Sequence, residues 1–490
     1  MQLINDDLKP VPTSKRTWNR WHFAALWVGM CVCIPTYMIA ASMIGAGMNW
    51  WQALFTVFFG NLIVLIPMIL NAHAGTAYGI PFPVFARASF GVLGANLPAM
   101  LRAIVACGWF GIQTWIGGTS IMAVIIVFWP SFSELPNVLP DFFGVGTPGF
   151  LCFMIFWFIN LYIIWKGSEA IKWVENLCAP FLIVSGLALL IWAVTQVGSL
   201  SAVLGQETKL TTLSEFLPVF VPSLTAMVGF WATLSLNIAD FSRYAKNQRE
   251  QQWGQAIGLP PTMALFSFIG IGVTGATVIL YGEAIWDPVA LVTKFTNPIV
   301  IFVSMFALMI ATLSTNIAAN VVGPANDFSN LYPEKISFKR GAFITGIIGI
   351  LMMPWKLIAD PSGYIFTWLI GYSALLGPIA GIMLVDYFII RKTKLNAEDL
   401  YRLDGEYTYT KGVNWIAVVA LILGVLPSLP GFLVQIDWIA PNSISSFWIR
   451  LYEYAWFVGL AVSGILYFMG MKLAAQMAPA PFTRNSYDRH

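Results

Sequence analysis

The chain has 490 residues, of which 58% are hydrophobic and only 10% are charged. Apolar runs of about 18 residues or more recur from one end to the other, which excludes a soluble globular protein and predicts a polytopic membrane protein. The formal net charge of +3 says little in itself. We expect the lipid bilayer and a small-molecule substrate as partners, and no nucleic acid.

Hydropathy predicts twelve membrane spans after a polar N-terminal segment that lacks the apolar core of a cleaved signal peptide. The spans lie near 24–48, 51–71, 96–129, 147–165, 171–198, 214–238, 254–282, 296–321, 340–357, 363–389, 413–435 and 446–470. The longest polar insertion is 391–412, so no soluble catalytic domain is expected. The five cysteines lie in or beside apolar segments and are expected to be small buried side chains (Cys31, Cys33, Cys107, Cys152 and Cys178).

The basic residues predict the orientation. All but four of the 26 Lys and Arg residues fall on one side of the predicted spans, and the four exceptions are Lys209, Lys294, Lys356 and Arg450. Because cytoplasmic loops of membrane proteins are enriched in Lys and Arg, both termini are expected in the cytoplasm. We therefore expect a multi-pass protein of the plasma or inner membrane.

Two spans carry helix-breaking residues near their centres. Pro35 lies in the first span, and Pro218, Pro222 and Gly229 lie in the sixth. Proline frees backbone carbonyls at bilayer depth. Matching defects in two halves of a chain suggest an inverted repeat of five plus five helices, with a site where the broken helices meet. The alternative is that the prolines only kink packed helices.

The repeat divides the all-helical chain into six parts. These are a cytoplasmic segment 1–23, the repeats 24–198 and 199–390, a cytoplasmic loop 391–412, two further helices in 413–470 and a cytoplasmic tail 471–490.

Polar side chains inside two spans indicate a site. Gln113 lies in the apolar stretch GWFGIQTW (108–115), and an amide at bilayer depth costs several kcal/mol unless it is paired or faces a cavity. We therefore expect Gln113 to have a partner. The eighth span contains Ser314, Thr315, Asn316 and Asn320. The two asparagines share a helix face, and the hydroxyls could bind Na+ opposite carbonyls freed in a broken helix. The alternative is hydrogen bonding between helices.

Several long motifs resemble one family of transporters. They are HAGTAYGIPFPVFARASFG (73–91), GWFGIQTWIGG (108–118), FWATLSLNIADFSRYA (230–245), ATLSTNIAANVVGPA (311–325) and LLGPIAGIMLVDYFIIRK (375–392). They resemble the nucleobase-cation-symport-1 family, whose members include hydantoin, allantoin, cytosine and uracil permeases. The resemblance extends over nearly the whole chain. It implies the inverted-repeat fold of sodium-coupled amino-acid transporters, with two helices added at the C-terminus.

The resemblance also implies the roles of individual residues. In hydantoin permeases a flat ring is stacked between two tryptophans, which match Trp109 and Trp231, the latter preceded by Phe230. A glutamine and an asparagine that bind the ring edge match Gln113 and Asn320. The residues of the family's cation site match Gly29, Val32, Ala311, Ser314 and Thr315. The coupling ion is Na+ in some members of the family and a proton in others. The resemblance also implies that the stretch 367–377 closes over the bound ligand.

One departure from the family concerns the substrate. Cys33 stands where hydantoin, allantoin and cytosine permeases carry an amide, and a thiol is a poor hydrogen-bond partner. The amide of Gln113 offers a donor and an acceptor, which suits the C=O and N–H of an imide edge. We therefore expect a monomeric cation symporter, without other cofactors, that imports uracil or a related cyclic ureide. Allantoin, hydantoin, purine and cytosine permeases are the alternatives.

A membrane-embedded enzyme and a channel are the alternatives to a symporter. A membrane-embedded enzyme would need a metal or nucleophile motif, and the sequence shows neither. A channel would favour a continuous polar pore over a site closed by two indoles.

Overall fold

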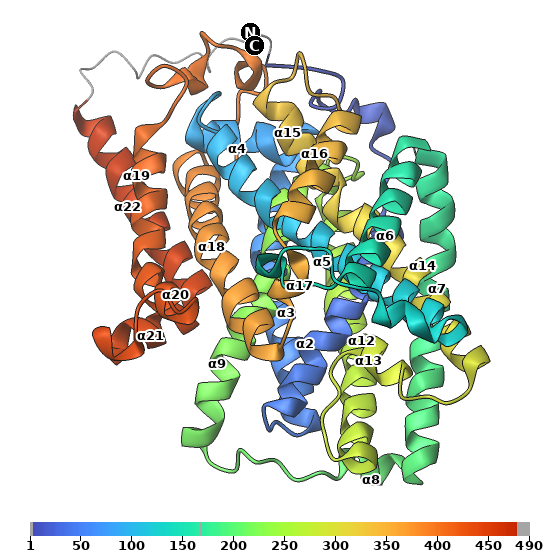
Figure 1. Ribbon diagram of the computed structural model, residues 1–490. Helices are drawn as coiled ribbons and strands as arrows, with labels where there is room; N and C mark the ends of the chain where they lie inside the picture. Colours follow the sequence, from blue (N-terminus) through green and yellow to red (C-terminus); the bar gives the residue numbers. More distant parts are fainter. Residues whose placement is uncertain (1–2, 167, 478–490) are drawn as a thin grey trace.

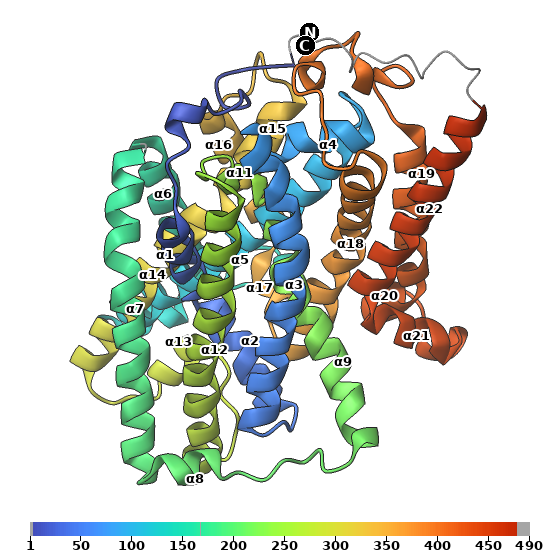
Figure 2. The same cartoon turned by 180° about the vertical axis from the view of Figure 1, so that it is seen from behind.

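The computed structural model describes residues 3–166 and 168–477, with the side chains of 168–180 and 182 left out of the description. Within these residues the secondary structure is helical apart from two isolated β-bridges. Figures 1 and 2 show the helices as one bundle, with the segment before α1 and the end of α22 at the same end of it. The side chain of Cys178 and residues 478–490 of the predicted tail lie outside the described part.

Nine apolar segments of the described chain are long enough to cross a bilayer. They are α3 (Trp50–Tyr78), α5 (Asn96–Phe128), α6 (Thr147–Lys166), α9 (Leu213–Phe230), α12 (Gln248–Tyr281), α14 with α15 (Pro298–Asn320 and Val322–Leu331), α18 with its π-helical neighbours η4 and η5 (Gly371–Leu384, Gly363–Ile370 and Val385–Ile390), α19 with η8 and α20 (Trp415–Val425, Leu426–Ser428 and Leu429–Gln435), and α22 (Ala455–Met477). A tenth span is formed by the bent pair α1 (Arg20–Cys31) and α2 (Ile34–Gly45).

The described part of the structure therefore supports ten of the twelve predicted membrane spans, if the bent pair is counted as one span. The fifth predicted span coincides with α7 (Ser168–Val197), of which Ile183–Val197 is described as an apolar helix. The ninth coincides with α16 (Phe338–Leu351), whose 14 residues are too few for a full crossing. The twelfth region holds two helices, α21 (Ser446–Glu453) and α22. The other short helices are α4 (Phe82–Phe90), α8 (Leu200–Leu204), α10 (Ala232–Asn237), α11 (Ala239–Ser242), α13 (Pro288–Val292) and α17 (Pro354–Leu357).

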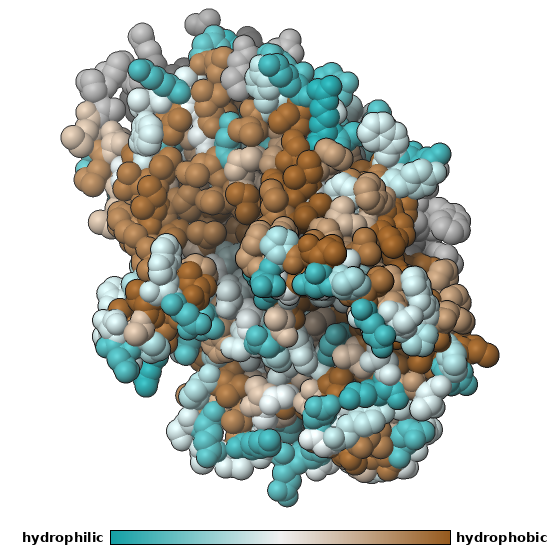
Figure 3. Space-filling model, in the orientation of Figure 1, coloured by the Kyte–Doolittle hydropathy of each residue, from teal (hydrophilic) through white to brown (hydrophobic). Residues whose placement is uncertain are grey.

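The surface carries extensive hydrophobic area, as expected for a protein embedded in a bilayer. In Figure 3 hydrophobic side chains form a broad band across the upper half of the visible face, with hydrophilic ones above it and a mixture of both kinds below it. The C-terminal helices α19 and α22 lie against α18 at one side of the bundle (Figure 1). Gly377 and Gly381 of α18 lie so close to the backbone of α22 that a Cβ atom there would collide with it. Small residues four apart permit this close packing in membranes.

The first predicted break is present. α1 and α2 meet at an angle of 60°, and Val32 and Cys33 lie between them. Pro35 is the second residue of α2, where its missing N–H leaves no helical bond unmade. The N–H of Cys33 bonds to the carbonyl of Cys31 rather than to that of Gly29, and this frees the Gly29 carbonyl from the helical ladder.

The second break lies beside Gly229, one of the three residues that predicted it, and not at the two prolines. Pro218 and Pro222 are accommodated inside α9, and the helix is interrupted only at Trp231, which has φ −104° and ψ 6°. α10 resumes at Ala232. The N–H of Trp231 bonds to the carbonyl of Gly229, two residues earlier. The interruption therefore follows Gly229 and not the prolines.

One helix reaches both breaks. The hydroxyl of Tyr364, in η4, donates to the Pro35 carbonyl at 3.3 Å. The hydroxyl of Tyr372, two turns later in α18, donates to the Gly229 carbonyl at 2.8 Å. Both tyrosines are buried. Backbone groups away from water need such partners, so this helix stabilises the broken segments of both halves.

The Tyr372 hydroxyl is expected to contribute measurably to stability. Tyr372→Phe removes one of the two donors to the Gly229 carbonyl and should lower the free energy of unfolding by about 1 kcal/mol. Thermal unfolding of the purified protein would show this as a lower midpoint. The control is Tyr454→Phe, because Tyr454 is 44% exposed. Equal midpoints for the two variants would contradict the role of this bond.

Candidate functional site

A small cavity lies where the two breaks approach one another. Trp27 of α1 and Trp231 contact each other edge to face, with ring centroids 5.2 Å apart. The cavity has a volume of about 30 Å³. It is lined by Met30, Cys33, Pro35, Trp109, Gln113, Phe230, Trp231, Thr233, Leu234, Thr315, Ala319 and Asn320. All six substrate-contact residues predicted from the sequence are among them.

The stretch GWFGIQTW presents two of its side chains to this cavity. Trp109 and Gln113 are one helical turn apart on α5, and both are buried. The Gln113 Oε1 atom has no hydrogen-bond partner in the described structure. The expected partner of the Gln113 carbonyl oxygen is therefore not a protein group, and a ligand in the cavity could supply it. A buried polar atom without a partner costs about 1–3 kcal/mol.

Aromatic rings form one wall of the cavity. Phe230 contacts Trp109 at 5.2 Å and Trp231 at 4.9 Å between ring centroids, both in edge-to-face geometry. The Nε1 atom of Trp231 is also buried without a partner. The second break thus supplies both an apolar surface and an unused hydrogen-bond donor.

Three aromatic residues that the sequence analysis did not single out surround Trp109. Tyr364, Trp368 and Tyr372 have ring centroids 6.3, 5.9 and 6.4 Å from that of Trp109. Gly108 makes room for Trp368, because a Cβ atom there would collide with the Trp368 ring. Their spacing of four residues was a readable signal, since it places all three on one helix face. They belong to or border the stretch 367–377 that was expected to cover the ligand.

The two asparagines of α14 have different surroundings. Asn316 donates to Asn160 Oδ1 at 3.1 Å and to Thr114 Oγ1 at 3.2 Å, so it links α14 to α5 and α6. Asn320 donates to Asn316 Oδ1 at 3.1 Å and lines the cavity. Asn316 is therefore a hydrogen-bonding residue between helices, and it holds Asn320 at the cavity.

Cys33 reaches the cavity from the first break. It is the residue before α2, and its Sγ atom lies 3.2 Å from Thr36 Oγ1. Cys33 and the three other described cysteines are free and buried, as predicted (Cys31, Cys107 and Cys152).

The five residues matched to a cation site lie on the two helices that meet beside this cavity. Thr315 Oγ1 is 3.5 Å from the Gly29 carbonyl oxygen, and Thr315 also lines the cavity. The N–H of Thr36 bonds to Cys33 rather than to Val32, so the Val32 carbonyl is outside the helical ladder too. Ala311 and Ser314 are buried on the turn of α14 before Thr315. Carbonyls and hydroxyls are the oxygen ligands that a hard cation prefers.

A second, larger cavity of about 520 Å³ shares no lining residue with this one. Volume alone would place the functional site there. The smaller cavity is the better candidate, because buried polar atoms without partners converge on it from two helices.

Comparison with known proteins fits this geometry. Residues 10–459 match the family described as "Permease for cytosine/purines, uracil, thiamine, allantoin". The purine-uracil permease of Arabidopsis thaliana is 46% identical over 96% of this chain and 78% of its own length. The allantoin permease of Bacillus subtilis is 42% identical over 96% of this chain and 94% of its own length.

Solved structures agree with these relatives. Mhp1, a nucleobase-cation-symport-1 family transporter, is 25% identical in a closed conformation with bromovinylhydantoin bound, with a TM-score of 0.75 and 97% of each chain covered. Its inward-facing conformation is 26% identical, with a TM-score of 0.77 and 98% and 96% coverage. A Na+-coupled sialic acid symporter shares the fold, with a TM-score of 0.60 at 14% identity and 94% and 90% coverage.

The predicted family, the transport function and the absence of an enzymatic role are thereby confirmed. The chain belongs to the nucleobase-cation-symport-1 family of permeases and is a multi-pass secondary active membrane transporter for small molecules.

Proposed function

We propose that this permease is a cation symporter that imports uracil or a related cyclic ureide such as allantoin. The observation that carries the proposal is the cavity at the two breaks, which combines indole faces with the unused carbonyl oxygen of Gln113. The two relatives above 40% identity are named for purine and uracil and for allantoin. Both uracil and allantoin present an imide edge with adjacent C=O and N–H groups.

Each cavity residue has a proposed task. Trp109 and Trp231 contact the two faces of the flat ring, and Phe230 packs edge to face against both indoles. Because the cavity of about 30 Å³ has room for only about one water molecule, these side chains must move apart when the ring enters. Gln113 accepts a hydrogen bond from a ring N–H through Oε1 and donates one to a ring carbonyl through its NH2 group. Asn320, held by Asn316, binds a second ring edge. Cys33 supplies a weakly polar wall on the remaining side.

The coupling ion is proposed to bind beside the substrate. The carbonyls of Gly29, Val32 and Ala311 and the hydroxyls of Ser314 and Thr315 would hold Na+, because carbonyls released at the first break face α14. Thr315 also lines the substrate cavity, so the two sites share a residue. This gives a direct route for binding at one site to affect the other.

Alternating access is proposed to act on an inverted repeat of 24–198 and 199–390, with the helices of 413–470 added outside it. Support comes from the two breaks, one in each half, and from the shared stabilising helix. The segment 1–23, the loop 391–412 and the tail 471–490 are proposed to lie in the cytoplasm of a cell whose plasma or inner membrane holds the protein as a monomer.

Uptake measurements test the proposal as a whole. Proteoliposomes with an inward Na+ gradient should accumulate labelled uracil or allantoin above the external concentration, and dissipating the gradient should abolish accumulation. Equilibration without accumulation under every cation gradient would overturn the symporter assignment. Accumulation of purines with no uptake of uracil or allantoin would overturn the substrate assignment.

The first specific prediction concerns Gln113. Gln113→Glu keeps the shape but removes the NH2 donor, so one ligand carbonyl loses its partner at a cost of about 1–3 kcal/mol. Binding of uracil, hydantoin or allantoin should fall more than tenfold, whereas guanine, which offers donors at this edge, should lose less. Gln113→Leu should weaken all of them. The control is Gln435→Glu, at the end of α20 and away from the cavity. Unchanged transport of every substrate by Gln113→Glu would refute the assigned role.

The second prediction concerns the cation. Thr315→Ala removes a proposed ligand hydroxyl and should abolish the Na+ dependence of substrate binding while the protein still folds. Thr312→Ala is the matched control, because Thr312 is also buried on α14 and its hydroxyl has no partner in the described structure. Titration of substrate binding with and without Na+ measures the effect. Na+-independent binding by the unmodified protein would contradict the site.

A further inference from the structure

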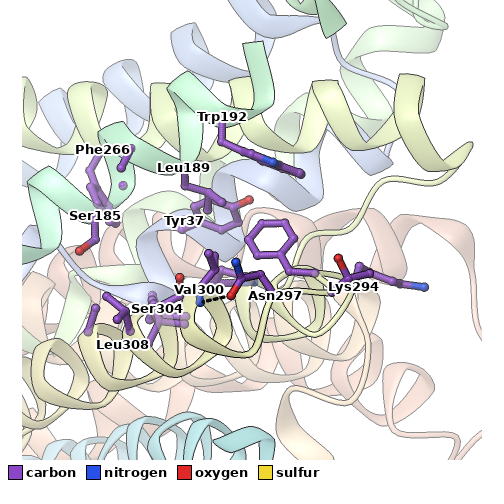
Figure 4. A pocket seen from close by; sticks show the side chains of 18 of the residues that line it. Tyr37, Ser185, Leu189, Trp192, Phe266, Lys294, Asn297, Val300, Ser304 and Leu308 are labelled. Atoms are coloured by element: carbon purple, nitrogen blue, oxygen red, sulfur yellow. Dashed lines mark hydrogen bonds between the residues drawn. The ribbon is translucent and has the colours of Figure 1, made fainter. Parts of the chain in front are cut away.

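The larger cavity has no role in the proposed transport cycle. It lies between α2, α7, α12, the loop after α13 and α14, and its walls are mostly apolar side chains. Figure 4 shows residues of all these segments directed at a common space, among them Tyr37, Trp192 and Phe266. Its volume of about 520 Å³ is in the range of cavities that bind small molecules.

The cavity is bordered by surface that faces the bilayer. Val300 and Val303 line it and are 42% and 53% exposed, on a helix that spans the membrane. On the opposite wall Trp192 of α7 lines it and packs against Phe295 with ring centroids 4.6 Å apart. A molecule dissolved in the bilayer can therefore approach the cavity along the exposed side of α14 that carries Val300 and Val303.

The depth of the cavity matches one leaflet. It runs from Lys294 and Asn297, at the start of α14, to Leu308. Leu308 is eleven residues after Asn297, a rise of about 16 Å along a helix, which is about half of a hydrocarbon core roughly 30 Å thick. In Figure 4 Lys294 lies at one end, whereas Leu308 and Phe266 lie at the other. One end is thus charged and the other apolar, as in a lipid molecule.

The charged end has groups suited to a phosphate. The Lys294 side chain is 50% exposed, and its ion pair with Glu283 is long, 3.8 Å, and exposed, so it contributes little. Asn297 uses its Oδ1 atom to accept from the N–H groups of Ile299 and Val300, which leaves its NH2 group to donate to a ligand. Farther in, the buried Tyr37 side chain lines the cavity, and its hydroxyl can donate to an ester oxygen.

We propose that the cavity binds an anionic phospholipid from the leaflet opposite the chain termini. One acyl chain lies between α7 and α14 and ends near Ala307 and Leu308, and the phosphate contacts Lys294. Ala307 is one turn before Ala311 of the proposed cation site, so the lipid contacts the helix that carries that site.

Photolabelling of the full-length protein tests this site. The protein is reconstituted in phosphatidylcholine vesicles with a small fraction of phosphatidylglycerol that carries a diazirine at the end of one acyl chain, and labelled peptides are mapped by mass spectrometry. We expect labelling at 304–308 and 185–189. Ser304→Trp, which fills the cavity, should reduce this labelling at least fivefold. Ile299→Trp is the matched control, because Ile299 is 72% exposed on the same helix and does not line the cavity.

A second pair of variants tests the headgroup. Lys294→Gln should reduce the labelling at least threefold, and Lys209→Gln, an exposed lysine outside the cavity, should not. Ala188→Phe fills the cavity from α7 and serves if Ser304→Trp does not fold. Labelling unchanged in the cavity-filling variants would overturn the site. Equal labelling by a diazirine fatty acid without phosphate, insensitive to Lys294→Gln, would overturn the phospholipid as its occupant.

Discussion

The structure depends on one constraint, which is that backbone carbonyls freed inside a membrane need partners. Two helices are interrupted at mid-length, after Cys31 and at Trp231. Water cannot satisfy the exposed groups at that depth, and each unsatisfied one costs several kcal/mol. The chain meets the cost with side chains from other helices. Tyr372 donates to the Gly229 carbonyl at the second break, and Thr315 approaches the Gly29 carbonyl at the first. Tyr364 donates to the carbonyl of Pro35, in the first turn of α2, and so ties the same helix to the first break.

These partners connect the parts that transport must move. Tyr364 and Tyr372 belong to the same helix that places Trp368 against Trp109. A displacement of that helix would change the contacts of Trp109 and the bonds to both breaks together. A ligand at the proposed site between the indoles would favour whichever arrangement it contacts better, and the equilibrium would shift by that difference in affinity. The stabilising contacts of the fold are therefore also the means by which a small ring can influence distant segments.

The sequence predicted much of this arrangement, but not its long-range partners. The existence of both breaks followed from proline and glycine at mid-span, whereas the second break lies at Trp231 because α9 absorbs Pro218 and Pro222. Gln113, Trp109, Trp231 and Asn320 lie around one cavity, as the family resemblance implied. The sequence analysis missed the two tyrosines that stabilise the breaks. The residues of 363–372 alone do not indicate which backbone carbonyl each tyrosine contacts, because those carbonyls are far away in the sequence. The ninth predicted span stays unconfirmed, because α16 has only 14 residues and ends in a turn.

Buried polar groups without partners need a cavity beside them before they indicate a binding site. Asn316 is bonded on several sides and is structural, whereas Gln113 keeps a free Oε1 atom in the cavity. Arg102 and Asp327 form a fully buried ion pair at 3.2 Å, yet two Arg102 nitrogens and one Asp327 oxygen also lack partners. Neither residue lines a described cavity of the transport site or the lipid site. Their pairing instead joins α5 to α15, where removal of either charge would leave the other buried alone.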